Sequence, residues 1–507
     1  MSSMNGEKTK KEKHPSIFEP FALILNIVTA VIGAVIGMQL VTSLGITPNT
    51  AIIGALIAML IARLPITLFS KYKSVHRQNL VQTSISSATF GAANSLLIPI
   101  GIPFVMGKPE LIMPMLIGAA LAMFVDAALL GIGTASGLLG SWLGVSMSAF
   151  GVAFIGNIWA LSMFGIGLLL RQYSVPLFGV DVNTVFIPHG FMIGAGVVAL
   201  IQVTMVIMKG KTKAGGTAKA SAAGTAGDDS SETYTTPDKQ TTRTLGLGFV
   251  AYLIISLILA ITGGLITEMS PGMFIGFLIF AAFAAYVHEL IVGIAAMHSG
   301  WFPAFAVALI TLIIGLLIGF PPVALALLVG FSVATGPAFA DMGYDLKTGY
   351  ILRGNGQDKE FELNGRKQQY VTGMIAFGVA LITVMFTYQG FFAQGLVPPV
   401  DAVYVKTIEA GASPEVAKQL LLWAIPGAIL QFVGGPSRQL GVLFATGLLI
   451  MNPGAGWAVL AGILIRMIVL KVKGKEAESS MGILAAGFIA GDAIYSFFSS
   501  MFKFSQK

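Results

Sequence analysis

PFALILNIVTAVIGAVIGMQLVTSL, residues 20–44, is an apolar run that contains no charged side chain. A helix needs about 20 apolar residues to cross the hydrocarbon core of a membrane. The run is longer than the roughly 7–15 apolar residues of a cleavable signal peptide, and the residues before it are polar. We therefore expect it to remain in the chain as a signal-anchor helix behind a short N-terminal tail.

The composition of the whole chain agrees with this interpretation. Of its 507 residues, 55% are hydrophobic and 10% are charged, and the mean hydropathy is +0.84. Soluble domains carry about 25% charged residues, so the composition indicates an integral membrane protein. The absence of cysteine excludes disulfides, iron–sulfur clusters and thiolate metal sites. The net charge of +7 comes from cations between apolar runs, which indicates membrane topology rather than nucleic-acid binding.

Apolar runs continue along the chain and predict an all-α polytopic membrane protein with about 14 transmembrane helices. Several runs are short or interrupted by Gly and Pro, so we expect some helices to be broken or re-entrant. The predicted spans are 20–44, 50–69, 84–106, 111–134, 146–171, 187–209, 245–267, 271–289, 301–320, 322–340, 370–392, 415–434, 440–471 and 480–502.

A segment rich in Gly, Ala, Ser and Thr divides the spans into two groups and has the composition of a flexible linker. The expected organisation is an N-terminal tail (1–19), a first membrane half (20–209), a linker (210–244), a second membrane half (245–502) and a C-terminal tail (503–507). Lys and Arg gather in the tail, the linker and a loop near 347–367, all on one side of the predicted topology. By the positive-inside rule that side is cytoplasmic, which predicts a multi-pass plasma-membrane protein with a cytoplasmic N-terminus.

Short sequence matches indicate that the two halves are related. Leu-Gly-Val at 143–145 recurs at 440–442, and Gly190-Phe191 with Gly194 recurs, at the same spacing, as Gly487-Phe488 with Gly491. The alternative is coincidence in a chain rich in Gly, Leu and Val. Related halves are common in secondary transporters, which bind substrate near the midplane between them.

The polar stretch 77–94, RQNLVQTSISSATFGAAN, is unusual at membrane depth. Unpaired polar groups are costly in a bilayer core, so such a stretch must face protein or a water-filled cavity. At 3.6 residues per turn its amide and hydroxyl side chains share one helical face, which predicts a substrate-lining stripe. The alternative is hydrogen bonding between packed helices. The stripe consists of Asn79, Gln82, Thr83, Ser86 and Ser87, with Asn94 further along.

Two motifs, one of ATP-binding proteins and one of metalloproteases, are incomplete in this sequence. Gly210-Lys211-Thr212 resembles the end of a P-loop, but Met205 stands where the motif requires Gly. His288-Glu289 begins like a metalloprotease helix, but Val292 replaces the second His. We therefore expect neither an enzyme nor a bound cofactor or metal, and an intramembrane enzyme is the weakest alternative.

Three carboxylic acids lie within predicted spans and are candidates for proton coupling. Asp126 is the most deeply placed, Asp492 lies in the last span and Glu289 follows His288. Burial in the membrane favours the protonated form of such an acid. The alternative is a buried acid held in a structural hydrogen-bond network.

A breaker cluster, Gly434-Gly435-Pro436-Ser437, precedes Arg438 at the end of a span. The end of a broken helix beside a cation suits an anionic carboxylate, so Arg438 is a candidate substrate ligand. Its alternative role is a snorkelling arginine at the membrane interface. Gln431, which corresponds to Asp126 if the halves are related, is included with it.

Several segments resemble the oligopeptide transporter (OPT) family, including its Yellow Stripe-like branch. Asp345-Leu346-Lys347-Thr348-Gly349-Tyr350 is similar to a family signature, and Arg-Lys-Gln-Gln at 366–369 follows it as the family's basic segment does. Asn79-Leu80-Val81-Gln82-Thr83 resembles an Asn-x-Val-Gln-Thr element, and the segment 485–492 resembles a pattern in the family's last helix. The long acidic N-terminal region of the fungal and plant peptide transporters is absent, so the resemblance is greatest to compact prokaryotic members.

The resemblance implies a proton-coupled importer of oligopeptides or metal–chelator complexes. Its partners would be a small-molecule substrate, protons and membrane lipids, without nucleic acid, and a homodimer is the default expectation for its assembly. Asp345, Lys347 and Tyr350 would form a cytoplasmic gating loop, or alternatively a helix cap with a lysine facing lipid phosphates. The rival functions are a passive channel and a lipid-handling membrane protein.

Overall fold

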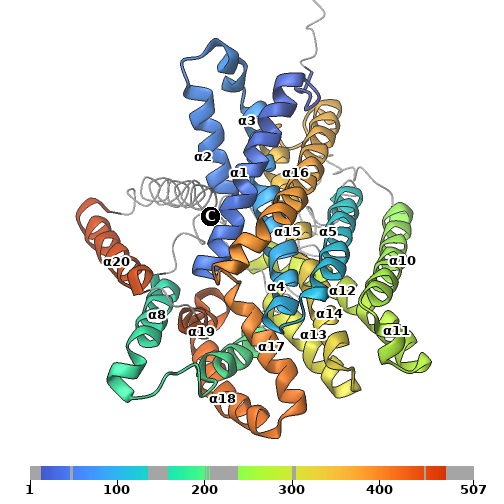
Figure 1. Cartoon of the computed structure of the whole chain (residues 1–507). Helices are drawn as coiled ribbons and strands as arrows, with labels where there is room; N and C mark the ends of the chain where they lie inside the picture. The colour runs from blue at the N-terminus through green and yellow to red at the C-terminus, as the bar shows by residue number, and fades with distance from the viewer. Residues whose placement is uncertain are drawn as a thin grey trace, which may run out of the picture.

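The computed structural model describes residues 13–45, 50–134, 158–199, 201–202, 205, 238–299, 304–449 and 453–474. All regular elements within these ranges are helices (Figure 1). Their bounds are α1 Pro20–Leu44, α2 Thr50–Arg63, η1 Thr67–Lys73, α3 Val75–Phe90, η2 Gly91–Leu97, α4 Ile98–Val105, η3 Pro109–Leu111, α5 Ile112–Thr134, α8 Ile158–Phe178, α10 Asp238–Thr262, α11 Leu265–Glu268, α12 Pro271–Ser299, α13 Ala304–Ile318, α14 Pro322–Ala334, α15 Pro337–Leu352, α16 Lys359–Ala393, α17 Pro399–Ala412, α18 Pro414–Arg438, α19 Leu440–Leu449 and α20 Pro453–Lys473.

Six helical segments in this part of the chain are long and apolar enough to cross a membrane, and shorter apolar helices accompany them. The six are Pro20–Thr42, Val75–Val105, Pro271–Gly293, Pro322–Leu352, Lys359–Ala393 and Pro414–Gly435. The chain is therefore an all-α polytopic membrane protein, as the sequence predicts. The count of about 14 spans and the relation between the halves stay predictions, because 480–502 and 146–157 lie outside the described residues.

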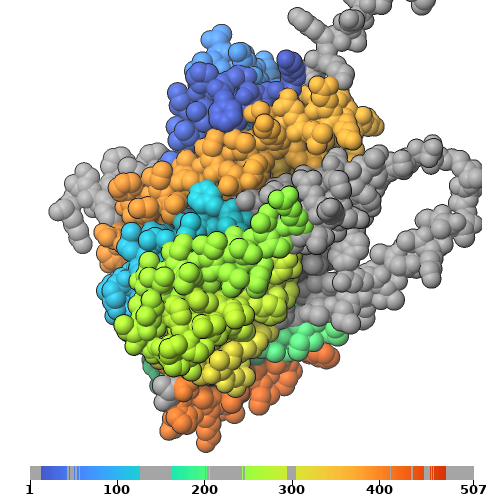
Figure 2. Space-filling view, turned by 90° about the vertical axis from the view of Figure 1, so that its right-hand side faces the viewer, coloured from blue at the N-terminus to red at the C-terminus, as the bar shows by residue number. Residues whose placement is uncertain are grey.

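Large apolar side chains cover the outer surface of the helix bundle. On α12, Ile275, Ile279 and Phe283 recur every fourth residue and are more than half exposed. Residues four apart lie on one helical face, so α12 presents a continuous apolar stripe to its surroundings. Figure 2 shows α10 to α12 covering one side of the molecule. A stripe of this kind suits contact with lipid tails.

Two broken helices form the buried centre. The first runs through α3, η2 and α4, where η2 is a π-helical segment; the second runs through α14 and α15 and is interrupted at Thr335–Gly336. Gly336 has φ 86°, a left-handed conformation that glycine adopts readily. Because both helices are interrupted inside the protein, backbone groups at the breaks are shielded from lipid.

Several predicted boundaries are wrong. The span expected to end at residue 340 continues as α15 to Leu352, and the expected loop at 393–414 contains α17. The span expected at 440–471 contains α19 and α20, with residues 450–452 outside the described part, and α10 is described from Asp238. In the first case the polar residues at 345–350 suggested a loop, but Asp345 bonds to Gln82 of α3 and Gly349 lies against Gln369 of α16. The division into two halves joined by a linker stays a prediction.

Candidate functional site

The polar stripe of α3 packs directly against two acids of α15. Ser86 Oγ donates a hydrogen bond to Asp341 Oδ1 at 2.7 Å. Gln82 Nε2 donates to Asp345 Oδ1 at 2.6 Å, and Ser87 Oγ donates to Asp345 Oδ2 at 3.3 Å. All of these side chains are buried. The stripe predicted from sequence thus meets a pair of carboxyl groups more than 250 residues away in the chain.

Asp341 and Asp345 are four residues apart, so they lie on the same face of α15 with Cβ atoms about 5–6 Å apart. Both are at most 1% exposed. Within the described residues their side chains bond to hydroxyl and amide groups, with no ion pair to a Lys or Arg. Two carboxylates this close in a buried site do not both ionise without a compensating cation. The pair therefore holds at least one proton in this conformation.

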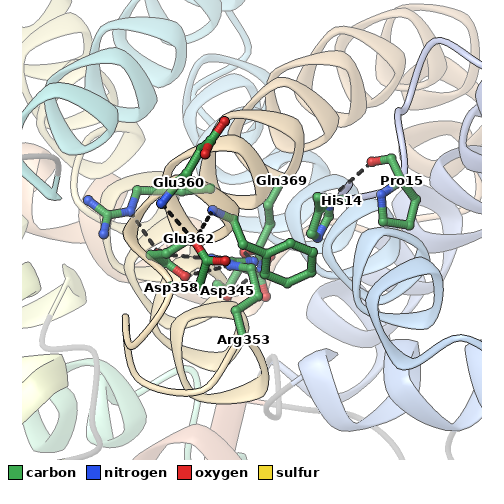
Figure 3. A network of polar contacts seen from close by, with 10 residues as sticks. His14, Pro15, Asp345, Arg353, Asp358, Glu360, Glu362 and Gln369 are labelled. Atoms are coloured by element: carbon green, nitrogen blue, oxygen red, sulfur yellow. Dashed lines mark hydrogen bonds and ion pairs between the residues drawn. The ribbon is translucent and has the colours of Figure 1, made fainter. Parts of the chain in front are cut away.

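Gln369 of α16 connects the acid pair to a buried ion pair. Its Nε2 donates to Thr83 Oγ1 at 2.9 Å and also to the main-chain carbonyl of Asp345. Arg353 Nη1 donates to Gln369 Oε1 at 3.1 Å. The guanidinium also holds Glu362 in a two-point contact, with distances of 2.6 and 3.2 Å (Figure 3). This geometry fixes the orientation of the Gln369 amide beside the acids.

Residues 13–19 close the same end of the bundle. Ile17 donates its main-chain N–H to Gln368 Oε1 at 2.9 Å, and Arg77 pairs with Glu19 at 2.7 Å. The His14 ring lies 5.3 Å from the His76 ring, measured between centroids. Burial, with a smaller contribution from the charge of nearby Arg353, lowers the pKa of His14 to about 4. At neutral pH the N-terminal segment therefore places a neutral His14 ring beside the network that Figure 3 shows.

Steric crowding explains why Gly349, in the signature-like segment 345–350, is a glycine. A Cβ atom on Gly349 would overlap Gln369 Oε1 and Arg353 Nη1. Only a residue without a side chain lets these two groups approach α15 and meet each other. The requirement follows from the close approach of two helices rather than from a turn.

We predict that Gly349→Ala weakens the fold. The methyl group must displace the Gln369 amide and the Arg353 guanidinium, and overpacking of a buried site costs typically 1–3 kcal/mol. The melting temperature of the purified protein should fall. Gly462→Ala is the matched control, because nothing lies within 4 Å of a Cβ atom at that helical position. Equal melting temperatures for the two variants would contradict the steric argument.

Five of the six predicted stripe residues come together at this site. Asn79 Nδ2 donates to Gln82 Oε1 at 2.9 Å and extends the network by one turn. Asn94 lies further along, in η2, and is half-buried. In this conformation the stripe is buried and forms hydrogen bonds with other protein groups. This arrangement is the one expected if the stripe serves helix packing. Contact of these residues with a substrate remains a prediction.

The structure does not bring Gln431 and Arg438 to this site. Both belong to α18, at the opposite end of the molecule from the start of α3 (Figure 1). Gln431 is buried and its Nε2 donates to Gln202 Oε1 at 2.9 Å. Arg438 is exposed, with its guanidinium carbon 5.7 Å from the centre of the Trp159 ring. The helix does break here, because Gly435 has φ 73°. A role in substrate binding remains a prediction for both residues.

Of the three acids singled out for proton coupling, only Glu289 has its side chain in the described part of the structure. Glu289 is 1% exposed and accepts a hydrogen bond from the Tyr252 hydroxyl at 2.9 Å. The adjacent His288 has its Nδ1 2.8 Å from Ser332 Oγ. Asp126 belongs to α5, but its side chain is outside the described part of the structure. Asp492 is also outside the described residues.

The prediction of a gating loop at Asp345, Lys347 and Tyr350 is wrong about the secondary structure. All three lie in α15, and Asp345 is fully buried. The Lys347 ammonium lies 4.7 Å from the centre of the Tyr350 ring. The polar composition of this segment resembles a loop, but Asp345 and Gly349 pack against α3 and α16, and Lys347 and Tyr350 are half-buried.

Sequence reasoning missed four members of the site. Asp341 precedes Asp345 by one helical turn, and this spacing was a usable signal once 345 was placed in a helix. Gln369 belonged to the basic segment at 366–369. Arg353 and Glu362 looked like ordinary loop charges, and only their burial sets them apart.

The sequence was compared with protein families and with curated proteins. The model of the OPT oligopeptide transporter protein family matches residues 135–503, well over half of the chain. The chain belongs to the OPT family. This OPT protein is therefore a multi-pass membrane transporter and not an enzyme. No curated protein is similar enough to count as a match.

Proposed function

We propose that this OPT protein is a proton-coupled importer of oligopeptides in the plasma membrane, with Asp341 and Asp345 as its proton-binding groups. One observation carries the proposal. The two segments that resemble family motifs, 79–83 and 345–350, meet in space around a buried pair of acids. Polar groups of this kind inside a membrane protein mark ion or substrate pathways.

The surroundings of the pair suit reversible proton binding. Hydroxyl and amide donors from Ser86, Ser87 and Gln82 stabilise an ionised carboxylate, whereas burial and the second acid favour the protonated one. A fixed cation would hold the acids permanently ionised. Here the nearest guanidinium of the described network, Arg353, is instead neutralised by Glu362.

The cations define the orientation that we propose. Residues 13–19, η1, the start of α3 and the turn at 353–358 lie at one end of the molecule (Figure 1), and they carry Lys71, Lys73, Arg77 and Arg353. The positive-inside rule makes this end cytoplasmic. Protons would then reach the acid pair from the opposite face and leave toward the cytoplasmic one.

We predict that purified protein in proteoliposomes accumulates oligopeptide against its gradient when an inward proton gradient is imposed. A protonophore should abolish accumulation, whereas addition or removal of ATP should have no effect. A passive channel would give only downhill flux under every condition. Accumulation that survives the protonophore would contradict proton coupling.

The substrate class needs a separate measurement. A ligand that binds only the folded state raises the melting temperature, so di- to hexapeptides and metal–chelator complexes can be compared directly. We expect peptides to stabilise the protein because the family match names oligopeptides. Stabilisation by metal–chelator complexes alone would replace the proposed substrate and leave the proton site unaffected.

A further inference from the structure

Another buried acid, Asp401, lies far from the Asp341–Asp345 pair. It is in the first turn of α17 and is 0% exposed. Acids near the start of a helix are stabilised by its free N–H groups, and an acid at the N-cap accepts hydrogen bonds from them. Asp401 does not: within the described residues neither carboxyl oxygen accepts a hydrogen bond. An ionised carboxylate in such surroundings is very costly, so the group is held in its neutral, protonated form.

The carboxyl group faces the second half of the central broken helix. A Cβ atom on Gly101 of α4 would overlap Asp401 Oδ2 and would also lie 3.4 Å from Pro398 Cδ. Glycine at 101 therefore lets the acid pack directly onto the α4 backbone. Gly101 is fifteen residues beyond Ser86 on the α3–η2–α4 helix, which at 1.5 Å per residue separates the two acid sites by roughly 20 Å.

No other charge explains the burial of Asp401. In the described structure α17 packs against α4, α13, α14, α18 and α19, and its Val403 also clusters with Met192 of the helix Ile187–Ala199. Among these helices α18 carries Glu415, Lys418 and Arg438, all exposed, and the helix Ile187–Ala199 carries one titratable side chain, the buried His189. On α17 itself, Tyr404 follows Asp401 by three residues, is 0% exposed, and its hydroxyl has no hydrogen-bond partner in the described residues. Lys406 is half-buried and paired with the exposed Glu409.

We propose that Asp401 is a second proton-binding group of this transporter, placed at the end of the molecule opposite residues 13–19. Figure 1 shows α17 and the end of α4 in that half of the molecule. When α4 and α17 separate, Asp401 is a carboxylate in contact with water, the Tyr404 hydroxyl donates to it, and the carboxylate takes up one proton from that face. When they close, the neutral acid is occluded against Gly101. The transport role rests on the proposed function, but proton binding by Asp401 does not.

The chain between the two acid sites contains irregular helical segments that suit this movement. Residues 91–97 form the π-helical segment η2 between α3 and α4, and π-helical turns occur frequently at functional sites. Pro99 and Pro103 lie in α4, and proline removes main-chain hydrogen bonds within a helix. The chain between Ser86 and Gly101 is therefore less regular than an unbroken α-helix, which suits a bend between the two acid sites.

Infrared spectroscopy of the purified protein at neutral pH tests proton binding without transport. A neutral carboxylic acid gives a carbonyl band separate from that of a carboxylate. Part of this band should disappear in Asp401→Asn, which keeps the shape of the side chain. Glu409→Gln, an exposed acid on the same helix, is the matched control and should leave the band unchanged. An unchanged band in Asp401→Asn would overturn the proposal.

Transport measurements test the coupling role. Asp401→Asn should lose proton-driven accumulation while substrate exchange across the membrane persists. Wild-type accumulation in this variant would overturn the role, whereas failure of the wild-type protein to respond to protons would refute the proposed function instead. If Asp401→Asn does not fold, the pH dependence of transport by Tyr404→Phe tests the role of Asp401. Loss of the donor should move the pH midpoint of transport upward, and an unchanged pH profile would overturn the proposal.

Discussion

Asp345→Asn is expected to abolish proton-driven accumulation of substrate. Each 1.4 kcal/mol corresponds to a factor of ten, so with one proton per substrate a gradient of one pH unit supports about tenfold accumulation. The variant should reach only equal concentrations inside and outside. Asparagine has nearly the shape of aspartate and keeps an oxygen that accepts from Gln82 Nε2, but it cannot exchange a proton.

Substrate exchange separates this effect from a loss of folding. Exchange of labelled for unlabelled substrate needs no net proton movement, so Asp345→Asn should retain it. Glu289→Gln is the matched control, because Glu289 is an equally buried acid that accepts a hydrogen bond from Tyr252. Loss of accumulation in Glu289→Gln with normal accumulation in Asp345→Asn would move the coupling site to α12.

Asp341→Asn completes the comparison within the pair. Ser86 donates to only one of its oxygens, and the other has no partner among the described residues. If the two acids share one proton, either substitution should remove coupling. If only Asp345 exchanges the proton, Asp341→Asn should leave the accumulation ratio intact.

The sequence alone predicted the class of fold and one side of the site. The high apolar content identified the membrane bundle, and the spacing of Asn79, Gln82 and Thr83 placed them on one helical face. Neither observation identifies what the face meets. The contacts of Gln82 with Asp345 and of Thr83 with Gln369 join segments more than 250 residues apart. Such pairings depend on the packing of helices, which the pattern within each helix does not specify.

The mistaken loop at 345–350 has a clear physical origin. Composition assigns Asp, Lys, Thr and Gly to water because these residues are costly in lipid. In this protein Asp345 faces two other helices, and Gly349 serves a close contact with Gln369. The same residue types are therefore compatible with a helix at the buried centre. Hydropathy cannot distinguish a buried polar helix from a loop.

Arg353→Met is expected to cause the largest loss of stability. The Arg353–Glu362 pair has side chains only 0% and 3% exposed. Removal of one partner of a buried ion pair typically costs 3–5 kcal/mol, because the other charge loses its compensation. Arg366, 3.0 Å from Glu362, retains part of that compensation. The melting temperature in detergent should fall markedly. Lys406→Met, in a pair whose side chains are 35% and 49% exposed, is the matched control.

Exposed ion pairs contribute about 0–1 kcal/mol, so Lys406→Met should change the melting temperature little. Equal decreases in melting temperature for Arg353→Met and Lys406→Met would show that the buried Arg353–Glu362 pair does not stabilise the fold more than an exposed pair does.

Arg353→Met combined with Glu362→Gln should recover part of the stability, because no uncompensated charge then remains inside. Transport should not recover with it. Arg353 also holds Gln369 at 3.1 Å, and without that contact the amide beside Asp345 loses its fixed orientation.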